Sequence, residues 1–188
     1  MTDRTHFESF VQEYQDMVYG TAVRLVANPA EAEDIAQTVF LKAFERFDAI
    51  GTSPAVAGWL KTVTTNLCLN HLARYLSRWR FFSELRGRDE DEAGDESAVN
   101  ALMMRAGTAT AASVETDLAS TAEAERLEDA LRKLPASQRV PIVLFHFENK
   151  SYVEIAALLG VSLAKVKTDI HRGREKLRSV LQATHASR

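Results

Sequence analysis

The chain has 188 residues, 46% of them hydrophobic, and a formal net charge of -3. These values exclude a wholly disordered chain and favour one ordinary domain or two small ones, each with an apolar core. The single cysteine, Cys68, excludes an internal disulfide and a pair of thiolate metal ligands. The first residues, MTDRTHFESF, contain no apolar run typical of a signal peptide, and no run of about 18 apolar residues follows. We therefore expect a soluble, cytoplasmic protein.

Charge is distributed unevenly along the chain. Lys and Arg number 8 against 9 Asp and Glu in residues 1–80, 3 against 11 in residues 81–125, and 12 against 6 in residues 126–188. The corresponding net charges are -1, -8 and +6. A basic C-terminal segment in an acidic chain favours a nucleic-acid partner for that segment.

The N-terminal part of the chain predicts three helices. Apolar residues recur at steps of three and four from the start to Leu25, which is typical of one helix. A second helix is expected from its cap, Asn28, to about Phe47, with Glu31 placed to complete a capping box. A third helix is expected from Trp59 onward, to about Trp79. The residues expected to be buried on the second and third helices are Ile35, Val39, Phe40, Ala43, Phe47, Trp59, Leu60, Val63, Leu67 and Leu76.

Residues 81–114 differ in composition from both flanks. The stretch DEDEAGDE has six acids in eight positions, and RAGTATAAS is small and polar, so we expect a solvated linker. Helical periodicity resumes after the linker and stops at Pro135, and further helices follow. The sequence therefore predicts an all-α fold of two small helical domains, 1–80 and 115–188, joined by an acidic linker.

The stretch SYVEIAALLGVSLAKVKTDIHRGREKLR predicts a helix-turn-helix. Its first helix is expected to end at Gly160, and Ser162 is expected to cap the second. The residues expected in its interior are Val153, Ile155, Ala156, Leu159, Val166, Ile170 and Leu177. The opposite face of the second helix carries small, hydroxyl and basic side chains, which suit a helix that enters the DNA major groove. An ordinary helical hairpin with a solvated basic face is the alternative.

Asp169 is an acidic residue inside this basic helix. It falls at the flank of the outward face, within three or four residues of Lys165 and Arg172, and pairing with either would neutralise it. It could also accept a hydrogen bond from cytosine N4. In either role it should weaken non-specific binding to phosphates.

Three stretches follow one another along the chain: NPAEAEDIAQTVFLKAFERF, WLKTVTTNLCLNHLARYLSR and LRKLPASQRVPIVLFHFENKSYVEIAALLGVSLAKVKTDIHRGREKLR. Together they resemble region 2 and region 4 of the extracytoplasmic-function (ECF) sigma factors of bacterial RNA polymerase. The resemblance implies a three-helix region 2 in residues 1–80 and a four-helix region 4 in residues 115–188. It also implies an alternative sigma factor that binds core polymerase and directs promoter-specific initiation in a stress or signal response.

The resemblance implies three contact surfaces. Core polymerase would be bound, through its β′ subunit, by Glu33, Asp34, Gln37, Thr38 and Leu41. The minus-ten promoter element would be held by Trp59, Lys61, Asn66, Asn70, Arg74 and Arg78. The minus-35 element would be read by Ala164, Lys165, Lys167, Thr168, His171, Arg172 and Arg174.

The sequence departs from the family pattern at a few of these positions. Thr38 stands where the family usually has a Glu. This departure could weaken polymerase binding slightly or make it depend on a further factor. Ala164-Lys165 and Asp169 stand where members often have a Gly-Thr pair and an Arg, which bears on the promoter sequence. For Trp59, a position in the core is favoured over a role as a wedge between promoter bases.

The partners implied are the β′ and β subunits of the polymerase core, promoter DNA and an anti-sigma factor. The free protein is expected to be monomeric and to make no contact with a membrane.

We expect no catalytic set, cofactor or metal, because the sequence has no Gly-rich phosphate loop, HExxH motif or Cys/His pair. One alternative is a dimeric helix-turn-helix regulator that binds a palindrome without polymerase. Another is a helical enzyme with an attached DNA-binding module, which the missing catalytic set disfavours.

Overall fold

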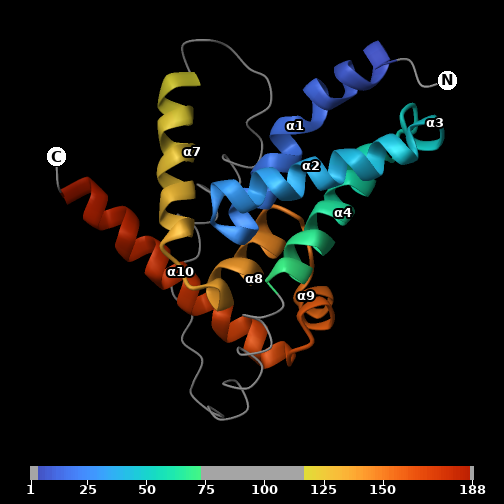
Figure 1. Ribbon diagram of the computed structural model, residues 1–188. Helices are drawn as coiled ribbons and strands as arrows, with labels where there is room; N and C mark the ends of the chain where they lie inside the picture. Colours follow the sequence, from blue (N-terminus) through green and yellow to red (C-terminus); the bar gives the residue numbers. More distant parts are fainter. Residues whose placement is uncertain (1–3, 73–116, 187–188) are drawn as a thin grey trace. The chain divides into compact units, whose positions relative to one another are not determined.

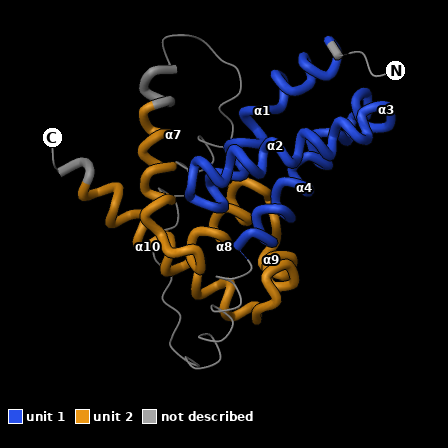
Figure 2. The backbone as a smooth tube through the Cα atoms, viewed as in Figure 1, with its two compact units in different colours: residues 1–74 blue, residues 75–188 orange. Residues whose placement is uncertain are grey.

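The computed structural model describes residues 4–72 and 117–186, and all regular elements in these ranges are helices. The chain divides into two compact units, residues 1–74 and residues 75–188 (Figure 2). The helices of the first unit are α1 (Arg4–Val26), α2 (Pro29–Glu45), α3 (Phe47–Ile50) and α4 (Val56–His71) (Figure 1). Those of the second unit are α7 (Asp117–Arg132), α8 (Ala136–His146), α9 (Tyr152–Leu159) and α10 (Leu163–Ala186). The predicted all-α fold is confirmed, whereas the predicted linker lies outside the described residues.

The core of the first unit lies between α1, α2 and α4, each of which packs against the other two. Its most deeply buried apolar side chains are Val18, Ala22, Leu25, Ala32, Val39, Ala43, Leu60 and Cys68. The cysteine is therefore a buried core residue. Because α2 turns one face toward α1 and α4, its opposite face remains exposed.

The beginning of α2 is capped as predicted. Asn28 Oδ1 accepts a hydrogen bond from the Ala30 N–H at 3.1 Å. Glu31 does not complete a capping box with Asn28. Its carboxylate lies instead 2.9 Å from Nε2 of His71, in the last turn of α4, and joins the two helices.

Two predicted helix limits are wrong by a few residues. α2 ends at Glu45, and Phe47 starts the short helix α3, where its ring packs edge-on against Phe7 and Phe10, with centroids 5.2 Å away in both cases. α4 begins at Val56, before Trp59, and Val56 is only 5% exposed. Burial of Val56 thus accompanies the extension of α4 toward its N-terminus.

The periodicity of the sequence locates the core of the first unit with limited accuracy. Buried as predicted are Ile35, Val39, Ala43 and Leu60. Only half-buried are Phe40, Phe47, Trp59, Val63 and Leu67. Leu76 and the predicted end of the third helix lie outside the described residues.

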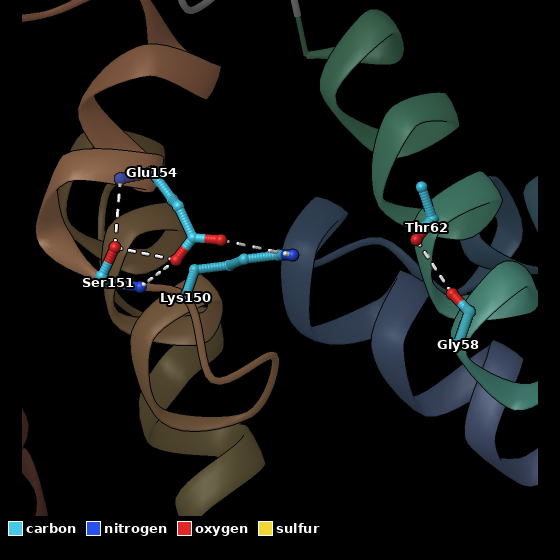
Figure 3. Close-up of polar contacts among 5 residues, drawn as sticks. All are labelled: Gly58, Thr62, Lys150, Ser151 and Glu154. Atoms are coloured by element: carbon cyan, nitrogen blue, oxygen red, sulfur yellow. Dashed lines mark hydrogen bonds and ion pairs between the residues drawn. The ribbon is translucent and has the colours of Figure 1, made fainter. Parts of the chain in front are cut away.

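In the second unit, α10 packs against α7, α8 and α9. Gly160 joins α9 to α10 in the left-handed conformation, with φ 65° and ψ 38°, which glycine adopts without strain. Ser151 and Glu154 form a capping box at the start of α9, with N–H to oxygen distances of 3.3 and 2.8 Å (Figure 3). Ser162 Oγ accepts from the Lys165 N–H at 3.2 Å, so Ser162 caps α10 as predicted. These local features form the helix-turn-helix.

The interior of the helix-turn-helix agrees with the prediction at most positions. Buried as predicted are Ile155, Leu159, Val166, Ile170 and Leu177, whereas Ala156 is half-buried. Val153 was predicted to be buried, and this was wrong, because it is 67% exposed. At about 100° per residue it lies nearly opposite Ile155, which occupies the buried face of α9.

Gly173 allows α10 to approach α8 closely. A Cβ atom at this position would lie 2.3 Å from Ile142 Cδ1 and 3.2 Å from Gln138 Cβ. Ile142 is fully buried, so its side chain has little room to move away. The distance between the two helices therefore depends on the missing side chain.

Gly173→Ala is expected to lower the free energy of unfolding by up to about 2 kcal/mol, measured by denaturant unfolding. The reason is that overpacking costs about 1–3 kcal/mol, against a gain of about 1 kcal/mol in helix propensity. The double variant with Ile142→Val lacks the clashing methyl group and should lose less than the sum of the two single losses. Gly58→Ala is the control, because no atom lies within 4 Å of its added Cβ, and it should not destabilise. Additive losses would contradict the proposed clash.

Candidate functional site

The outer face of α2 is the first candidate surface. All five residues predicted to contact polymerase are exposed: Glu33, Asp34, Gln37, Thr38 and Leu41. The structure adds Phe44, which is 49% exposed and continues this face one turn beyond Leu41, itself 65% exposed. Large exposed apolar side chains next to acids are typical of protein-binding surfaces.

Two details define the chemistry of this face. Thr38 Oγ1 donates to the Asp34 carbonyl oxygen at 2.9 Å, so the hydroxyl proton is used within the helix. The ring of Phe44 packs edge-on against Phe7 of α1, with centroids 4.9 Å apart, which restricts its orientation. The sequence predictions missed Phe44; its signal was its spacing of three residues from Leu41 on the same helix.

A polar ridge on α4 is the second candidate surface. Thr62, Asn66 and Asn70 follow one another at steps of four residues, and all three are exposed. Thr62 was not predicted; its Oγ1 donates to the Gly58 carbonyl oxygen at 2.9 Å (Figure 3). The ridge thus presents two amide side chains, each with donor and acceptor groups.

The remaining residues predicted for the minus-ten element fall into two groups. Trp59 and Lys61 are half-buried at the beginning of α4. Arg74 and Arg78 lie outside the described residues. The described part of this surface is therefore polar rather than basic.

The outer face of α10 is the third candidate surface. Ala164, Lys167 and Arg172 are exposed, and Thr168 and His171 are partly exposed. Thr168 Oγ1 donates to the Ala164 carbonyl oxygen at 3.0 Å, so this hydroxyl can only accept from a ligand. His171 Nε2 lies 3.7 Å from a carboxylate oxygen of Glu175 one turn further on. The face offers acceptor and cationic groups, as a base-reading helix requires.

Arg174 was predicted to read the minus-35 element, and this was wrong. It is only 5% exposed, because it lies about 40° from Ile170 around the helix, on the buried side of α10. Its guanidinium carbon lies 5.6 Å from the centroid of the Phe145 ring, and its Nη2 lies 3.1 Å from His146 Nε2. Arg174 therefore joins α10 to the end of α8.

Asp169 lies on the buried flank of α10 and is 3% exposed. Its Oδ1 is 2.5 Å from Lys165 Nζ, so one of the two predicted pairings is confirmed. The other possibility, a hydrogen bond to cytosine N4, does not fit, because the carboxylate is not accessible to DNA. Lys165 itself is only partly exposed, since its ammonium bends back toward Asp169.

His146 is an uncharged, half-buried neighbour of the buried Arg174. The pKa of His146 is lowered from 6.5 to about 4, mainly by burial and to a smaller extent by the positive charge of Arg174. Since the guanidinium only donates, Nε2 of His146 accepts and its proton lies on Nδ1.

The stability of the second unit is expected to fall as the pH drops from 6.5 toward 4. In this range an unfolded His146 binds a proton that the folded chain binds only near pH 4, so protonation favours unfolding. His146→Gln can still accept from Arg174 but does not titrate, and its melting temperature should fall by a few degrees less over this range. His6→Gln, an exposed control, should follow the parent protein. Equal pH dependence in all three proteins would contradict the half-buried, neutral state of His146.

Neither a metal site nor a membrane span occurs in the part of the chain that the structure describes. Within residues 4–72 and 117–186, no group of three or more His, Cys, Asp or Glu side chains could hold a metal ion. None of the described helices is long and apolar enough to cross a membrane.

Comparison with known families identifies the class of protein. The model of sigma-70 region 2 matches residues 10–79, and the model of sigma-70 region 4 matches residues 124–177. The two matches contain the α2 face and the helix-turn-helix, respectively. They define a sigma-70-type transcription initiation factor.

Individual relatives narrow this class. The RNA polymerase sigma-E factor of Streptomyces coelicolor is 30% identical over 185 residues, covering 97% of this chain and 90% of that protein. The ECF RNA polymerase sigma factor SigW of Bacillus subtilis is 29% identical over 180 residues, covering 96% and 91%. In the co-crystal structure of the sigma factor RpoE with the anti-sigma factor NepR from Bartonella quintana, a chain matches with a TM-score of 0.48 and 20% identity, covering 94% of this chain and 96% of that chain. The present chain belongs to the ECF sigma factors of bacterial RNA polymerase, and it is an alternative sigma factor that directs transcription initiation.

Proposed function

We propose that the outer face of α2 binds the β′ subunit of core RNA polymerase. The observation that carries this proposal is the exposure of Leu41, 65%, among the exposed residues Glu33, Asp34 and Gln37. An apolar centre with a charged border combines affinity with electrostatic selection of a basic partner. Thr38 adds no charge, and Phe44 extends the apolar centre.

Leu41→Ala and Asp34→Lys are each expected to weaken binding to core polymerase by roughly tenfold or more, measured by titration of labelled protein. Neither side chain is needed for the core of the unit, since both are exposed. Asp16→Lys makes the same charge change on an exposed position of α1 and should bind as the parent does. Equal losses in Asp34→Lys and Asp16→Lys would mean that overall charge, not the α2 face, governs binding.

The second unit is proposed to read the minus-35 element with the outer face of α10. Arg172 and Lys167 supply cations for phosphates or guanine, and the Thr168 hydroxyl can accept from a base amino group. Ala164 and His171 complete this face, whereas Arg174 has no part in it, because it is buried.

Arg172→Ala is expected to reduce promoter binding by the holoenzyme by about 1–3 kcal/mol, roughly a factor of 5 to 150. The control is Arg132→Ala, which removes an equally basic, exposed side chain from α7 of the same unit. Each holoenzyme is bound to labelled promoter DNA and competed with unlabelled promoters that carry changed minus-35 base pairs. If Arg172→Ala binds the promoter as the parent does, whatever Arg132→Ala does, α10 is not part of the DNA interface.

The minus-ten element is proposed to contact α4 and the residues that follow it. Asn66, Asn70 and Thr62 form the described polar ridge, and amide side chains of this kind hydrogen-bond the edges of unstacked bases. Trp59 and Lys61 flank the ridge. Arg74 and Arg78 continue the same four-residue spacing in the sequence.

The protein is further proposed to act by binding alone, as a cytoplasmic monomer without a cofactor. An anti-sigma factor that covers the exposed apolar side chains of α2 would restrain it until a signal arrives. A dimer that binds a palindrome without polymerase would favour the alternative of a conventional regulator. Mass measurement of the free protein separates the two.

A further inference from the structure

Helix α10 is basic along its outer face, yet one of its cations is held back from that face. Lys165 lies in the first turn, and its side chain is only 22% exposed. Its Nζ lies 2.5 Å from Oδ1 of Asp169, whose side chain is 4% exposed. The ammonium thus folds along the helix toward the interior of the unit.

Two physical effects keep the lysine in this position. A carboxylate as buried as Asp169 requires a positive partner, because an uncompensated charge in the interior is strongly destabilising. The pair is spaced i,i+4, which allows the two side chains to meet on one face of the helix. Lys165 cannot reach outward for a phosphate unless this pair is broken.

The neighbours of Lys165 show what the same side chain would do if released. The adjacent residue Ala164 and the nearby Lys167 are exposed on the outer face proposed to meet DNA. A free ammonium in the first turn would be within reach of the same DNA backbone and would displace a condensed counterion. The number of phosphate contacts made by α10 would therefore rise by one on release of Lys165.

We propose that Asp169 is a positioning residue that holds the Lys165 ammonium against α10 and withholds it from DNA phosphates. The helix then binds DNA without the Lys165 cation, and non-specific binding is weaker. This inference rests on the proposed role of α10 in promoter binding.

The test measures the binding of holoenzyme, assembled from the full chain and core polymerase, to a short duplex of random sequence at several salt concentrations. Asp169→Asn keeps the shape of the side chain but removes its charge and releases Lys165. The slope of log K against log salt should become steeper by about 0.9, the value for one added phosphate contact. The affinity of the variant relative to the parent should then rise about 3.5-fold when salt falls from about 200 mM to about 50 mM.

Two further variants assign the effect to Lys165. Asp129→Asn makes the same charge change at an exposed position of α7 and should keep the parental slope. Asp169→Asn combined with Lys165→Met removes both charges and should return the slope to the parental value. A general loss of folding would lower affinity without making the slope steeper, so the slope separates positioning from a structural role.

The outcomes separate the inference from the proposed function. A holoenzyme that forms and initiates, but has the same slope with Asp169→Asn, overturns the inference alone. A slope that remains steep in the double variant also overturns it, because another group would then supply the contact. If the parent protein forms no holoenzyme, the proposed function fails, and the inference fails with it.

Discussion

The close approach of α10 to α8 at Gly173 is the constraint on which the surface proposed to bind DNA depends. Only a residue without a side chain leaves room for Ile142, and the buried residues Val166, Ile170 and Leu177 then face the core. Once this side of α10 is buried, the identity of its outward residues is determined by the period of the helix. The same principle acts on α2, where burial of Ala32, Ile35, Val39 and Ala43 leaves the acidic and apolar residues outside.

This constraint also decides which charges are available to a partner. The C-terminal segment has a net charge of +6, but the charge count overstates what DNA can meet. Arg174 is hydrogen-bonded to His146 inside the unit, and Lys165 pairs with Asp169. The exposed cations left on this helix are those of Lys167, Arg172 and Lys176. Charge inside a folded unit serves packing and positioning, whereas charge on its surface serves association.

Periodicity predicted the helices, the capping residues Asn28 and Ser162 and most of the buried positions of the helix-turn-helix, because one apolar face per helix dominates burial. It failed for polar residues at the border of that face. Arg174 and Asp169 lie on the core side of α10, but their charge suggested exposure, and the His146 partner of Arg174 is 28 residues away in sequence. The opposite error occurred at Val153, an apolar residue that is exposed. Tertiary contacts decide such positions, and the sequence alone does not contain them.

The central claim is that this chain gives core polymerase its promoter specificity. The most direct test is transcription in vitro with core polymerase from a bacterial relative, this protein and a library of genomic fragments, with RNA starts read by sequencing. The account predicts starts that require the protein and share two upstream motifs at one fixed spacing, since both units are proposed to contact one promoter. Starts that are the same without the protein, or protein-dependent starts without a shared pair of motifs, would contradict it.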